Sequence, residues 1–428
     1  MALLCSVVFL YNLSIHLYWL GIRLVAVWNK KAELWLRGRG KTNDSRRRIA
    51  DFTLQTKIAK LDTPILWFHC ASLGEFEQGS PLMEALKKQN NGAKIVLTFF
   101  SPSGYEVRKD WPGADLVCYL PLDTKRNARQ FVEAIKPTAA FFVKYEFWYH
   151  HLNELNTRKI PTYLVAGRFR PGQVFFKWYG GLYRKMLGFF THFFLQDEKS
   201  AKLLEGINIT NKMVCGDPRY DRCLDNIKVG KSSTMLDEFC GKDFTIVAGS
   251  TWEPEEELLQ LTYKTTDHKI IIAPHDISRA KDIQKQFEGS VLYSEWVVRH
   301  SNLNVPEDAA IPYCLIVDNI GMLASLYQYA SVALVGGGFS GKLHNVLEAI
   351  AWGKAVFFGP NHSKFPEAKV MLKEGCGFEV ASKDDWQQLL EELYEMPEKL
   401  RAAGDVASNF MQKNAGATSK ILIALVKP

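Results

Sequence analysis

The amino-acid sequence predicts an α/β protein built from two Rossmann-like, doubly wound domains that face a cleft, preceded by an N-terminal membrane-anchor helix. Three observations support this prediction. The chain has 428 residues, more than one hydrophobic core usually supports, so two domains are expected. Short apolar runs alternate with helical stretches, which is typical of parallel β-α units. From Met1 to Ile22 the chain contains no Lys, Arg, Asp or Glu.

The N-terminal segment, residues 1–28, is predicted to be a single uncleaved membrane anchor. Its apolar run is just long enough to cross a bilayer, and Tyr18, Trp19 and Trp28 crowd its end like an interfacial aromatic belt. It lacks the basic start and the small-residue cleavage site of a signal peptide. Residues 29–48 are rich in Lys and Arg, so the positive-inside rule places the rest of the chain in the cytoplasm. The alternatives are a buried domain helix and an amphipathic helix in the membrane plane.

The first domain is expected to span residues 29–223 and to contain six parallel strands. Each candidate strand is a short apolar run, and helical stretches separate several of them. The expected strands are Ile65–His69, Lys94–Thr98, Leu116–Tyr119, Ala139–Val143, Thr162–Val165 and Phe193–Leu195, with helices at Gly79–Lys88 and Asn127–Ile135. The polar, weakly periodic stretch 224–243 is predicted to be the linker between the domains.

A second series of strands and helices predicts a C-terminal domain over residues 244–428. The expected strands are Phe244–Ala248, Lys269–Ala273, Cys314–Val317, Val332–Val335 and Ala355–Phe358, with helices at Pro254–Thr262, Ser278–Phe287 and Asn345–Ala351. Ligands of such sheets bind at the carboxyl ends of the strands. Residues that directly follow the strands are therefore the candidate site residues.

The composition argues against several classes of protein. Hydrophobic residues make up 47% and aromatic residues 12% of the chain, which excludes extensive disorder. Eight cysteines are scattered without a Cys-x-x-Cys pair, so we expect reduced, mostly buried thiols and neither a disulfide framework nor a zinc site. Histidines and acids form no compact ligand spacing, and no metal is expected. The net charge of +7 is mild.

Three motifs in the first half end a predicted strand or turn with a charged residue. Glu75 follows a strand and Ser72-Leu-Gly, where a general base can reach a substrate hydroxyl; a carboxylate favoured by a helix N-terminus is the alternative. Glu146 lies among aromatics after another strand, and a salt-bridged loop carboxylate is equally compatible. Arg219, in Gly-Asp-Pro-Arg, is suited to hold a phosphate or carboxylate, although it also fits a surface arginine.

Two glycine turns in the second half precede helices. Residues 248–257, Ala-Gly-Ser-Thr-Trp-Glu-Pro-Glu-Glu-Glu, fit helix capping by Ser250 or Thr251 better than anion binding. Gly336-Gly-Gly is followed by Asn345-x-x-Glu348, where a glycine-rich loop and a helix N-terminus offer donors to a phosphate. The pair Asn345 and Glu348 also fits a capping box. The spacing is not that of a Walker A loop.

These motifs together resemble the family of 3-deoxy-D-manno-octulosonic acid (Kdo) transferases of lipopolysaccharide synthesis. The resemblance runs from the N-terminal segment through Ala-Ser-Leu-Gly-Glu, Tyr-Glu-Phe-Trp, Gly-Asp-Pro-Arg, Ala-Pro-His and Asp-Asn-Ile-Gly to His-Asn-Val-Leu-Glu. It implies a GT-B fold and a metal-independent, inverting transfer of Kdo from CMP-Kdo to a lipid A precursor, lipid IVA. By the same resemblance Glu75 is the catalytic base, and Glu146 and Arg219 assist the transition state. The implied CMP-binding residues are Pro274, His275, Ile320, Gly321, Met322, Asn345, Val346, Leu347 and Glu348.

The sequence departs from the family pattern at four of these motif positions. Lys144 stands where relatives commonly have the first glutamate of a Glu-x-Glu-x-Trp motif, and Arg219 is often a lysine. His275 replaces a usual arginine, and Met322 replaces a usual glutamate. None of the four changes the proposed base.

The expected partners are CMP-Kdo, a lipid A precursor and the cytoplasmic face of an inner membrane, with no nucleic acid. Residues 168–190 interleave cations with aromatics; we favour a surface that dips into lipid headgroups, with a partly buried loop and helix or a nucleic-acid stacking surface as alternatives. Two other functions fit the sequence: another GT-B transferase that uses a UDP- or GDP-sugar, and a non-catalytic membrane or nucleic-acid binding module. The sequence does not indicate an oligomeric state.

Overall fold

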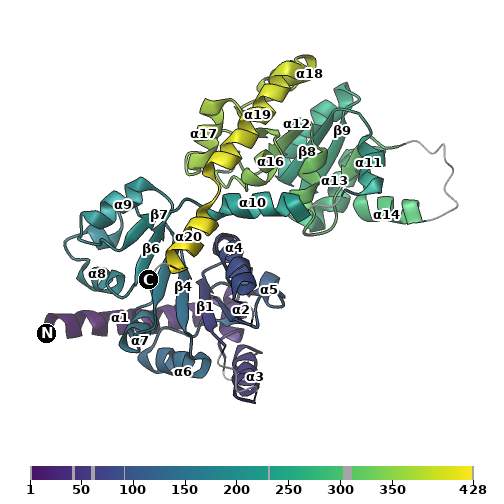
Figure 1. Cartoon of the computed structure of the whole chain (residues 1–428). Helices are drawn as coiled ribbons and strands as arrows, with labels where there is room; N and C mark the ends of the chain where they lie inside the picture. The colour runs from purple at the N-terminus through teal and green to yellow at the C-terminus, as the bar shows by residue number, and fades with distance from the viewer. Residues whose placement is uncertain are drawn as a thin grey trace. The chain divides into compact units, whose positions relative to one another are not determined.

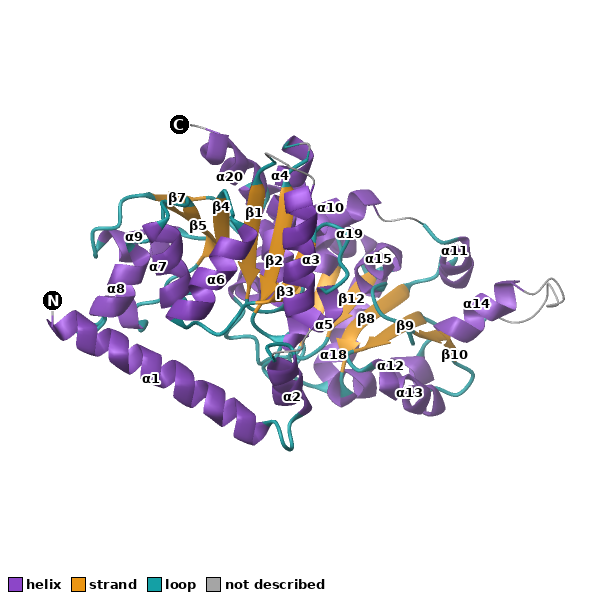
Figure 2. Ribbon diagram, turned by 90° about the horizontal axis from the view of Figure 1, so that it is seen from below, coloured by secondary structure: helices purple, strands orange, loops and turns teal. Residues whose placement is uncertain are grey.

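A computed structural model describes residues 2–40, 44–58, 63–90, 92–229, 232–301 and 311–426. The chain forms two compact units, one of residues 1–222 and 415–428 and one of residues 223–414. Each unit contains a seven-stranded sheet with helices on its faces (Figures 1 and 2). This is the GT-B architecture, and it confirms the predicted fold class.

The first unit holds an entirely parallel sheet. Its strands are β1 (Ile65–Cys70), β2 (Lys94–Phe99), β3 (Leu116–Tyr119), β4 (Ala139–Val143), β5 (Thr162–Gly167), β6 (His192–Leu195) and β7 (Lys212–Val214). Its helices are α1 (Ala2–Val25), α2 (Lys30–Arg37), α3 (Asp44–Ile58), α4 (Leu73–Gln89), α5 (Pro102–Arg108), α6 (Lys125–Ile135), α7 (Tyr149–Thr157), the 3-10 turn η1 (Val174–Phe176), α8 (Gly181–Leu187), α9 (Glu198–Glu205), α10 (Pro218–Val229) and α20 (Ala417–Val426). The unit boundary lies within α10.

The strand order of this sheet is β3-β2-β1-β4-β5-β6-β7. Because successive side chains of a strand point to opposite faces, the sheet supports two apolar clusters. Trp67 and Phe142 belong to the cluster that α3, α6, α7, α8 and α9 cover. Phe68 and Phe141 belong to the other cluster, which α4, α5 and α20 cover. Strands buried on both faces are continuous apolar runs, which is why the sequence reveals them so clearly.

The second unit holds a parallel sheet of order β10-β11-β9-β8-β12-β13-β14. Its strands are β8 (Thr245–Thr251), β9 (Lys269–Pro274), β10 (Val291–Leu292), β11 (Cys314–Ile316), β12 (Val332–Val335), β13 (Ala355–Phe358) and β14 (Gly377–Glu379). Its helices are α11 (Thr234–Cys240), α12 (Glu253–Thr265), η2 (Ile277–Arg279), α13 (Ala280–Gln286), α14 (Tyr293–Ser301), α15 (Leu323–Leu326), η3 (Tyr327–Tyr329), α16 (Leu347–Ala351), α17 (Pro366–Glu374), α18 (Lys383–Glu395) and α19 (Pro397–Asn414).

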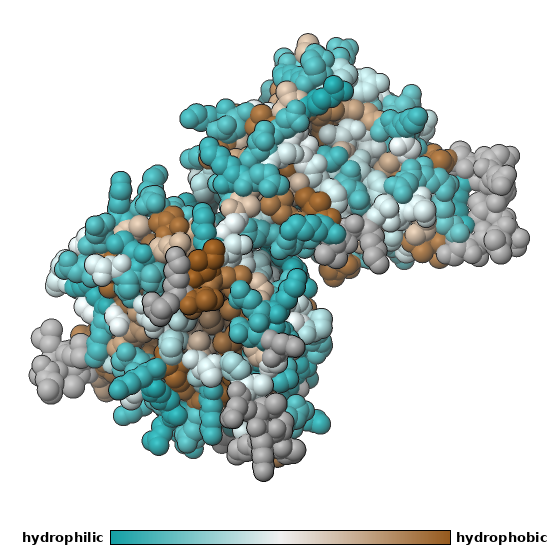
Figure 3. Space-filling view, viewed as in Figure 1, coloured by the Kyte–Doolittle hydropathy of each residue, from teal (hydrophilic) through white to brown (hydrophobic). Residues whose placement is uncertain are grey.

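Two expected boundaries differ from the structure. Most of the stretch 224–243, expected as a linker, is helical in α10 and α11, and Leu236 and Phe239 are buried there. The C-terminal domain, expected to reach residue 428, ends at residue 414, because α20 packs on the first unit. The Asp221 carboxylate accepts the backbone N–H groups of Gly416 and Thr418, both at 2.6 Å. The outer side of α20 remains apolar and forms the brown patch over this helix (Figure 3).

Local helix starts also differ from the expectations. Helix α4 begins at Leu73, six residues before the expected start, and Pro81 lies inside the helix. Helix α16 begins at Leu347, two residues later than expected. Trp252 directly precedes α12, and its backbone N–H donates to the Glu255 carboxylate at 3.0 Å. Ser250 and Thr251, the expected caps, belong to β8.

Helix α1 is long and apolar enough, over Val7–Val25, to cross a membrane. It also contacts the body of the first unit, because Val7, Val8 and Tyr11 pack against the cluster that contains Trp67. Figure 2 shows α1 running along one side of that unit. Length and composition therefore fit the predicted anchor, and one face of the helix has a protein partner.

Candidate catalytic and donor-binding residues

The first sheet reverses its strand order between β1 and β4, which are parallel neighbours. In doubly wound sheets this reversal opens a crevice at the carboxyl ends of the two strands, where ligands bind. Glu75 lies five residues after the last residue of β1, and Glu146 lies three residues after the last residue of β4. The two predicted carboxylates therefore follow the two strands at the switch point.

Glu75 lies in the first turn of α4 and is partly exposed. Ser72 directly precedes the helix in an extended conformation, and its hydroxyl donates a short hydrogen bond to the Glu75 carboxylate. A carboxylate is a favourable side chain in the first turn of a helix. A solvent-accessible carboxylate held by one hydroxyl is able to accept a proton from a substrate, as a general base requires.

Glu146 is held by two donors that sequence reasoning missed. Its Oε2 accepts the indole N–H of Trp148 at 2.7 Å and lies 3.0 Å from Nε2 of His69. Because an ionised carboxylate only accepts, this second contact requires a hydrogen on Nε2. His69 is fully buried in β1, and its Nδ1 lies 2.9 Å from the Thr98 hydroxyl oxygen. The available signal was a histidine inside an otherwise apolar strand.

Arg219 lies in α10, and its guanidinium is held by a carboxylate that sequence reasoning also missed. Asp217 accepts from Nε at 2.9 Å, from Nη2 at 2.8 Å and from the Arg219 backbone N–H at 3.0 Å. Buried Gln78 on α4 donates to the same carboxylate at 3.2 Å. Such a paired contact fixes the plane of a guanidinium. About 29% of the Arg219 side chain stays exposed for a ligand.

Lys144 connects two of these predicted residues, Glu75 and Arg219, electrostatically. It directly follows β4 with a φ of 69°, a left-handed conformation that is uncommon for a lysine and typical of strained functional sites. Burial lowers the pKa of its ammonium group; the Glu75 carboxylate opposes that shift, and the Arg219 guanidinium adds to it. Burial raises the pKa of the Cys70 thiol, and the carboxylates of Glu75 and Glu146 raise it further. The structure thus brings Glu75, Glu146 and Arg219 to one end of the first sheet.

The second sheet reverses its order between β8 and β12. The predicted donor residues follow the strands of this region: Pro274 ends β9 and His275 follows it, Ile320-Gly321-Met322 follow β11, and Asn345 to Glu348 follow the loop after β12. All of them lie toward the carboxyl edge of this sheet, as predicted. Strands β9 and β8 separate β11 from β12 in the sheet, so the segment 320–322 belongs to a different strand end from the segment 345–348.

The glycine loop after β12 is packed closely against neighbouring backbone. A Cβ on Gly336 would lie 2.1 Å from the Ser250 carbonyl oxygen, and one on Gly337 would lie 2.3 Å from the Lys342 carbonyl oxygen. The N–H of Gly337 donates to buried Glu255 at 2.9 Å. Burial raises the pKa of Glu255, although the N–H groups of Trp252 and Gly337 oppose the shift. These glycines therefore serve close backbone packing, and the Gly337 amide already has a partner.

Asn345 and Glu348 are joined side chain to side chain. The Asn345 amide donates to a Glu348 carboxylate oxygen at 3.0 Å, and its own oxygen accepts the N–H of Leu347 at 3.3 Å. This differs from the capping box that the sequence suggested, because Glu348 bonds to the Asn345 side chain. The pair is fixed in place and partly exposed. Both side chains retain accepting capacity for ligand hydroxyl groups.

Three aromatic rings meet beside this pair. The His275 ring lies 4.8 Å from the Trp252 ring and 4.5 Å from the His344 ring. Burial lowers the pKa of His344 to about 4, and the neighbouring His275 adds to this effect. His344 is therefore neutral near pH 7. The ring group offers flat apolar surfaces at the carboxyl edge of the second sheet, which suit a base or a sugar face.

Acidification is expected to destabilise the second unit through His344. The folded-state pKa of about 4 lies below the value of about 6.5 in an unfolded chain. The unfolded state therefore binds more protons between these values, so the contribution of His344 to stability is full above pH 6.5 and falls as the pH drops toward 4.

We expect a loss of about 1–2 kcal/mol in the free energy of unfolding after allowance for the partial exposure of His344. Melting curves between pH 7 and 4.5 measure it, and His344→Phe, which keeps a ring, should flatten the dependence. Equal pH slopes for both proteins would contradict the assignment.

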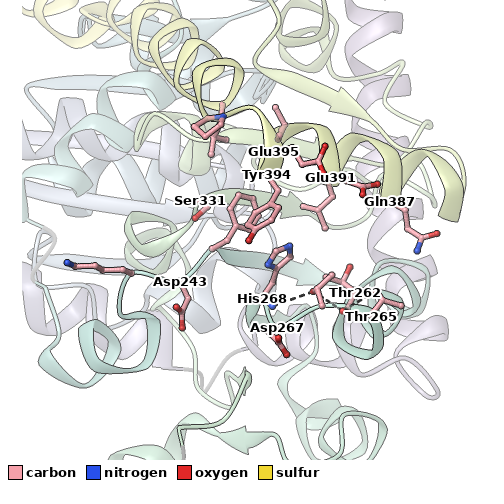
Figure 4. A pocket seen from close by; sticks show the side chains of 17 residues that line it. Asp243, Thr262, Thr265, Asp267, His268, Ser331, Gln387, Glu391, Tyr394 and Glu395 are labelled. Carbon is pink, nitrogen blue, oxygen red and sulfur yellow. Dashed lines mark hydrogen bonds between the residues drawn. The ribbon is translucent and has the colours of Figure 1, made fainter.

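A cavity of about 870 Å³ in the second unit lies away from these residues (Figure 4). Its lining includes Phe244, His268 and Ser331, which directly precede β8, β9 and β12. It is thus at the amino ends of the strands, opposite to the predicted donor residues. Glu391 and Glu395 lie on its wall, and such carboxylates disfavour a nucleotide phosphate.

Among the residues that the structure describes, no group of three or more His, Cys, Asp or Glu side chains is arranged to hold a metal ion. The seven described cysteines are free and buried, which agrees with the expectation of buried thiols. Lys144 supplies positive charge near Glu75, and Lys144 in turn interacts with Arg219. The prediction of a metal-independent reaction remains untested.

Comparison with known sequences shows consistent similarity to one family. The family described as 3-deoxy-D-manno-octulosonic-acid transferase (kdotransferase) matches residues 43–222. A 3-deoxy-D-manno-octulosonic acid transferase of Aquifex aeolicus is 28% identical over 345 residues, which are 78% of this chain and 88% of the relative. One from Chlamydia muridarum is 25% identical and covers 86% of each chain. A bifunctional glycosyltransferase/methyltransferase of Fusobacterium nucleatum is 25% identical over 82% of this chain and 56% of its own length.

Solved structures support the fold. A UDP-GlcNAc 2-epimerase of Neisseria meningitidis superposes with a TM-score of 0.59 at 16% identity and covers 86% of this chain and all of its own. MurG of Acinetobacter baumannii gives a TM-score of 0.51 at 12% identity, covering 85% of this chain and 99% of its own. At such low identities the similarity establishes the architecture alone.

Proposed function

Because this chain belongs to the 3-deoxy-D-manno-octulosonic acid (Kdo) transferase family and has the GT-B fold of glycosyltransferases, we propose that it transfers Kdo from CMP-Kdo to a lipid A precursor. The proposed acceptor is lipid IVA, and the proposed reaction inverts the configuration at the anomeric carbon. One observation carries the proposal. Glu75 is a partly exposed carboxylate that follows a strand at the switch point of the first sheet. It interacts electrostatically with Lys144, which also interacts with Arg219.

The proposed chemistry begins with a proton transfer to Glu75. The carboxylate takes the proton of an acceptor hydroxyl while that oxygen forms a bond to the anomeric carbon of Kdo. The bond between this carbon and the phosphate oxygen breaks, and CMP departs with the electron pair. The Ser72 hydroxyl orients the base, since a general base must be held within hydrogen-bond reach of its proton.

Charge on the departing CMP requires positive groups. Arg219 is oriented by Asp217 for this purpose, and preorganised charges of this kind stabilise a transition state without costly rearrangement. Glu146, fixed by Trp148 and His69, is proposed to hold a donor or acceptor hydroxyl group. We propose that these side chains suffice without a metal ion.

For donor binding we propose the carboxyl edge of the second sheet. The Asn345–Glu348 pair offers acceptors to ribose hydroxyls, and the rings of His275 and Trp252 offer flat surfaces to the base. Pro274, Ile320, Gly321, Met322, Val346 and Leu347 are proposed to complete the CMP contacts. His275 and Met322 stand where relatives usually have charged residues, so this chain is expected to rely more on stacking.

We also propose attachment to the cytoplasmic face of an inner membrane through α1. The helix has the length and apolar character of a membrane segment. An enzyme with a lipid acceptor has to bind that acceptor at the membrane surface. Basic residues follow the helix, including Lys30 and Lys31, and the anionic lipids of the cytoplasmic leaflet attract such residues.

The proposed reaction predicts a specific product. Detergent-solubilised enzyme incubated with CMP-Kdo and lipid IVA should release CMP and give lipid IVA heavier by one or more Kdo units in mass spectrometry. Parallel incubations with UDP- and GDP-sugars test the alternative donors. Turnover with those sugars and none with CMP-Kdo would replace the proposed donor, and addition of EDTA should leave the rate unchanged.

A further inference from the structure

Helix α1 is fastened to the first unit by buried polar contacts. The Tyr11 hydroxyl donates to Asp123 at 2.5 Å and accepts the Tyr149 backbone N–H at 3.2 Å. Asp123 is buried and also accepts the backbone N–H groups of His150 and His151, both at 3.0 Å. These contacts join α1 to the first turn of α7.

Further contacts extend this face along the helix. The Asn12 side-chain oxygen lies 2.6 Å from Nε2 of His150. Ile15 is buried, and the Tyr18 ring lies edge-on to the Trp35 ring at 5.8 Å. Tyr11, Ile15 and Tyr18 recur at helical spacing, so they form one continuous face. Protein covers this face at Tyr11 and Ile15, and Tyr18, with one edge against Trp35, stays 43% exposed.

The opposite face of α1 carries an exposed apolar stripe. Its members are the exposed leucines at spacings of three and four residues, Leu10, Leu13, Leu17, Leu20 and Leu24. At 100° per residue this stripe lies about 160° from the face that holds Tyr11 and Ile15. The helix is thus apolar on two sides, and the protein covers one of them.

A second exposed element lies next to the same helix. Trp178 is 91% exposed and Tyr179 is also exposed; both lie in the loop just before α8, which contacts α1. The Arg184 guanidinium donates to the carbonyl oxygens of Phe175 at 3.0 Å and Lys177 at 2.6 Å. The loop that presents Trp178 is therefore held in place. Exposed tryptophan and tyrosine are typical of groups that lie at the lipid headgroup level.

We infer that α1 lies parallel to the membrane surface and inserts only its leucine stripe, with Trp178 and Tyr179 beside it at headgroup depth. If α1 crossed the bilayer, the network of Asp123, His150 and His151 would have to enter the hydrocarbon region, which is costly for a buried carboxylate. In-plane docking keeps that network on the protein side. The inference rests on the membrane attachment proposed above and is independent of the reaction.

Charge identifies the occupant of the stripe as an anionic bilayer surface. Arg23, Lys30 and Lys31 lie at or just beyond the C-terminal end of α1, and Arg170 and Lys177 lie in the loop that leads to Trp178. Anionic headgroups attract such residues. A second copy of the chain on the same stripe would bring these like charges together, which disfavours a dimer at this face.

Spin labels measure the orientation directly. Single cysteines are introduced on the leucine stripe by Leu10→Cys, Leu17→Cys and Leu24→Cys. Each is made in a Cys5→Ser background so that the label attaches at one site, because the seven other cysteines are buried. On vesicles of phosphatidylethanolamine and phosphatidylglycerol, the three labels should report one shallow depth of about 5–10 Å. A crossing helix would separate the first and last labels by about 21 Å. Such a gradient, or labels that contact no lipid, would overturn the inference.

Matched charge substitutions test the stripe itself. Leu17 is 57% exposed, and Val107 on α5, in the layer on the other side of the sheet, is 56% exposed. Leu17→Glu should lower vesicle partitioning at least tenfold, Val107→Glu should leave it unchanged, and both proteins should keep their melting temperature. Equal partitioning of the two variants would contradict the inference. Transfer in detergent micelles, which need no docking surface, should persist in Leu17→Glu, so a failed reaction and a failed orientation remain distinguishable.

Discussion

Replacement of Glu75 by Gln is expected to lower kcat for Kdo transfer by about 10²–10⁴-fold, because a positioned general base contributes this much. Glutamine keeps the size of the side chain and a hydrogen bond with Ser72 but cannot accept the acceptor proton. The donor-binding residues belong to the second unit, so CMP affinity should stay within about twofold. Initial rates by mass spectrometry and titration calorimetry with CMP measure the two quantities.

Glu77 provides the matched control for this prediction. It lies on the same helix, two residues further, and its carboxylate pairs with Arg108 at 3.0 Å and Arg222 at 3.5 Å. Glu77→Gln should weaken those surface ion pairs slightly and leave kcat nearly unchanged. Transfer at the wild-type rate by Glu75→Gln would eliminate this residue as the base. An equal loss in both variants would indicate a general effect of charge on α4.

The strands were predictable because burial on both faces makes them unbroken apolar runs. β4, whose sequence is Ala-Ala-Phe-Phe-Val, is an example in which prediction and structure coincide at both ends. β7, β10 and β14 were missed. β10 has two residues, and β7 (Lys-Met-Val) and β14 (Gly-Phe-Glu) lack the unbroken apolar run that made the three-residue β11 recognisable. The return of α20 to the first unit was also not predictable. It depends on Asp221, whose partners lie nearly 200 residues further along the chain.

The candidate site was predictable only where a residue follows a strand. Glu75 and Glu146 could be identified in this way, because parallel strands end at a common edge. The supporting residues could not, since His69, beside Glu146, reads as part of an apolar strand, and Gln78, which holds Asp217 beside Arg219, lies just before the helix expected at Gly79–Lys88. The Gln78–Asp217 contact joins residues 139 positions apart, a relationship that no local pattern encodes. The glycine loop was predicted to approach a ligand, and the structure shows its backbone packed against Ser250 and Lys342.

Arg219 carries the second large prediction. Arg219→Ala is expected to lower kcat by about 10²–10³-fold, because the cation is proposed to meet charge that develops on CMP only as the bond breaks. The KM for CMP-Kdo should change little, since an interaction made mainly in the transition state affects kcat and kcat/KM alike. Arg219→Lys should keep most of the activity, because lysine retains the positive charge that the proposed role requires. Steady-state kinetics with varied donor separate the two constants.

Two further variants separate catalysis from folding. Arg222 lies on the same helix and pairs with Glu84 at 3.1 Å, so Arg222→Ala removes an equal charge without touching the proposed site and should keep kcat within about threefold. Asp217→Asn keeps the shape of the side chain but weakens its hold on the Arg219 guanidinium, and it should cost about tenfold in kcat. If Arg219→Ala raised KM and spared kcat, the guanidinium would hold the ground-state donor, and the leaving-group role would be wrong. If Arg222→Ala lowered kcat as much as Arg219→Ala, the loss would reflect the total charge of α10. A cation with a specific catalytic position would lose activity only when its own residue is replaced.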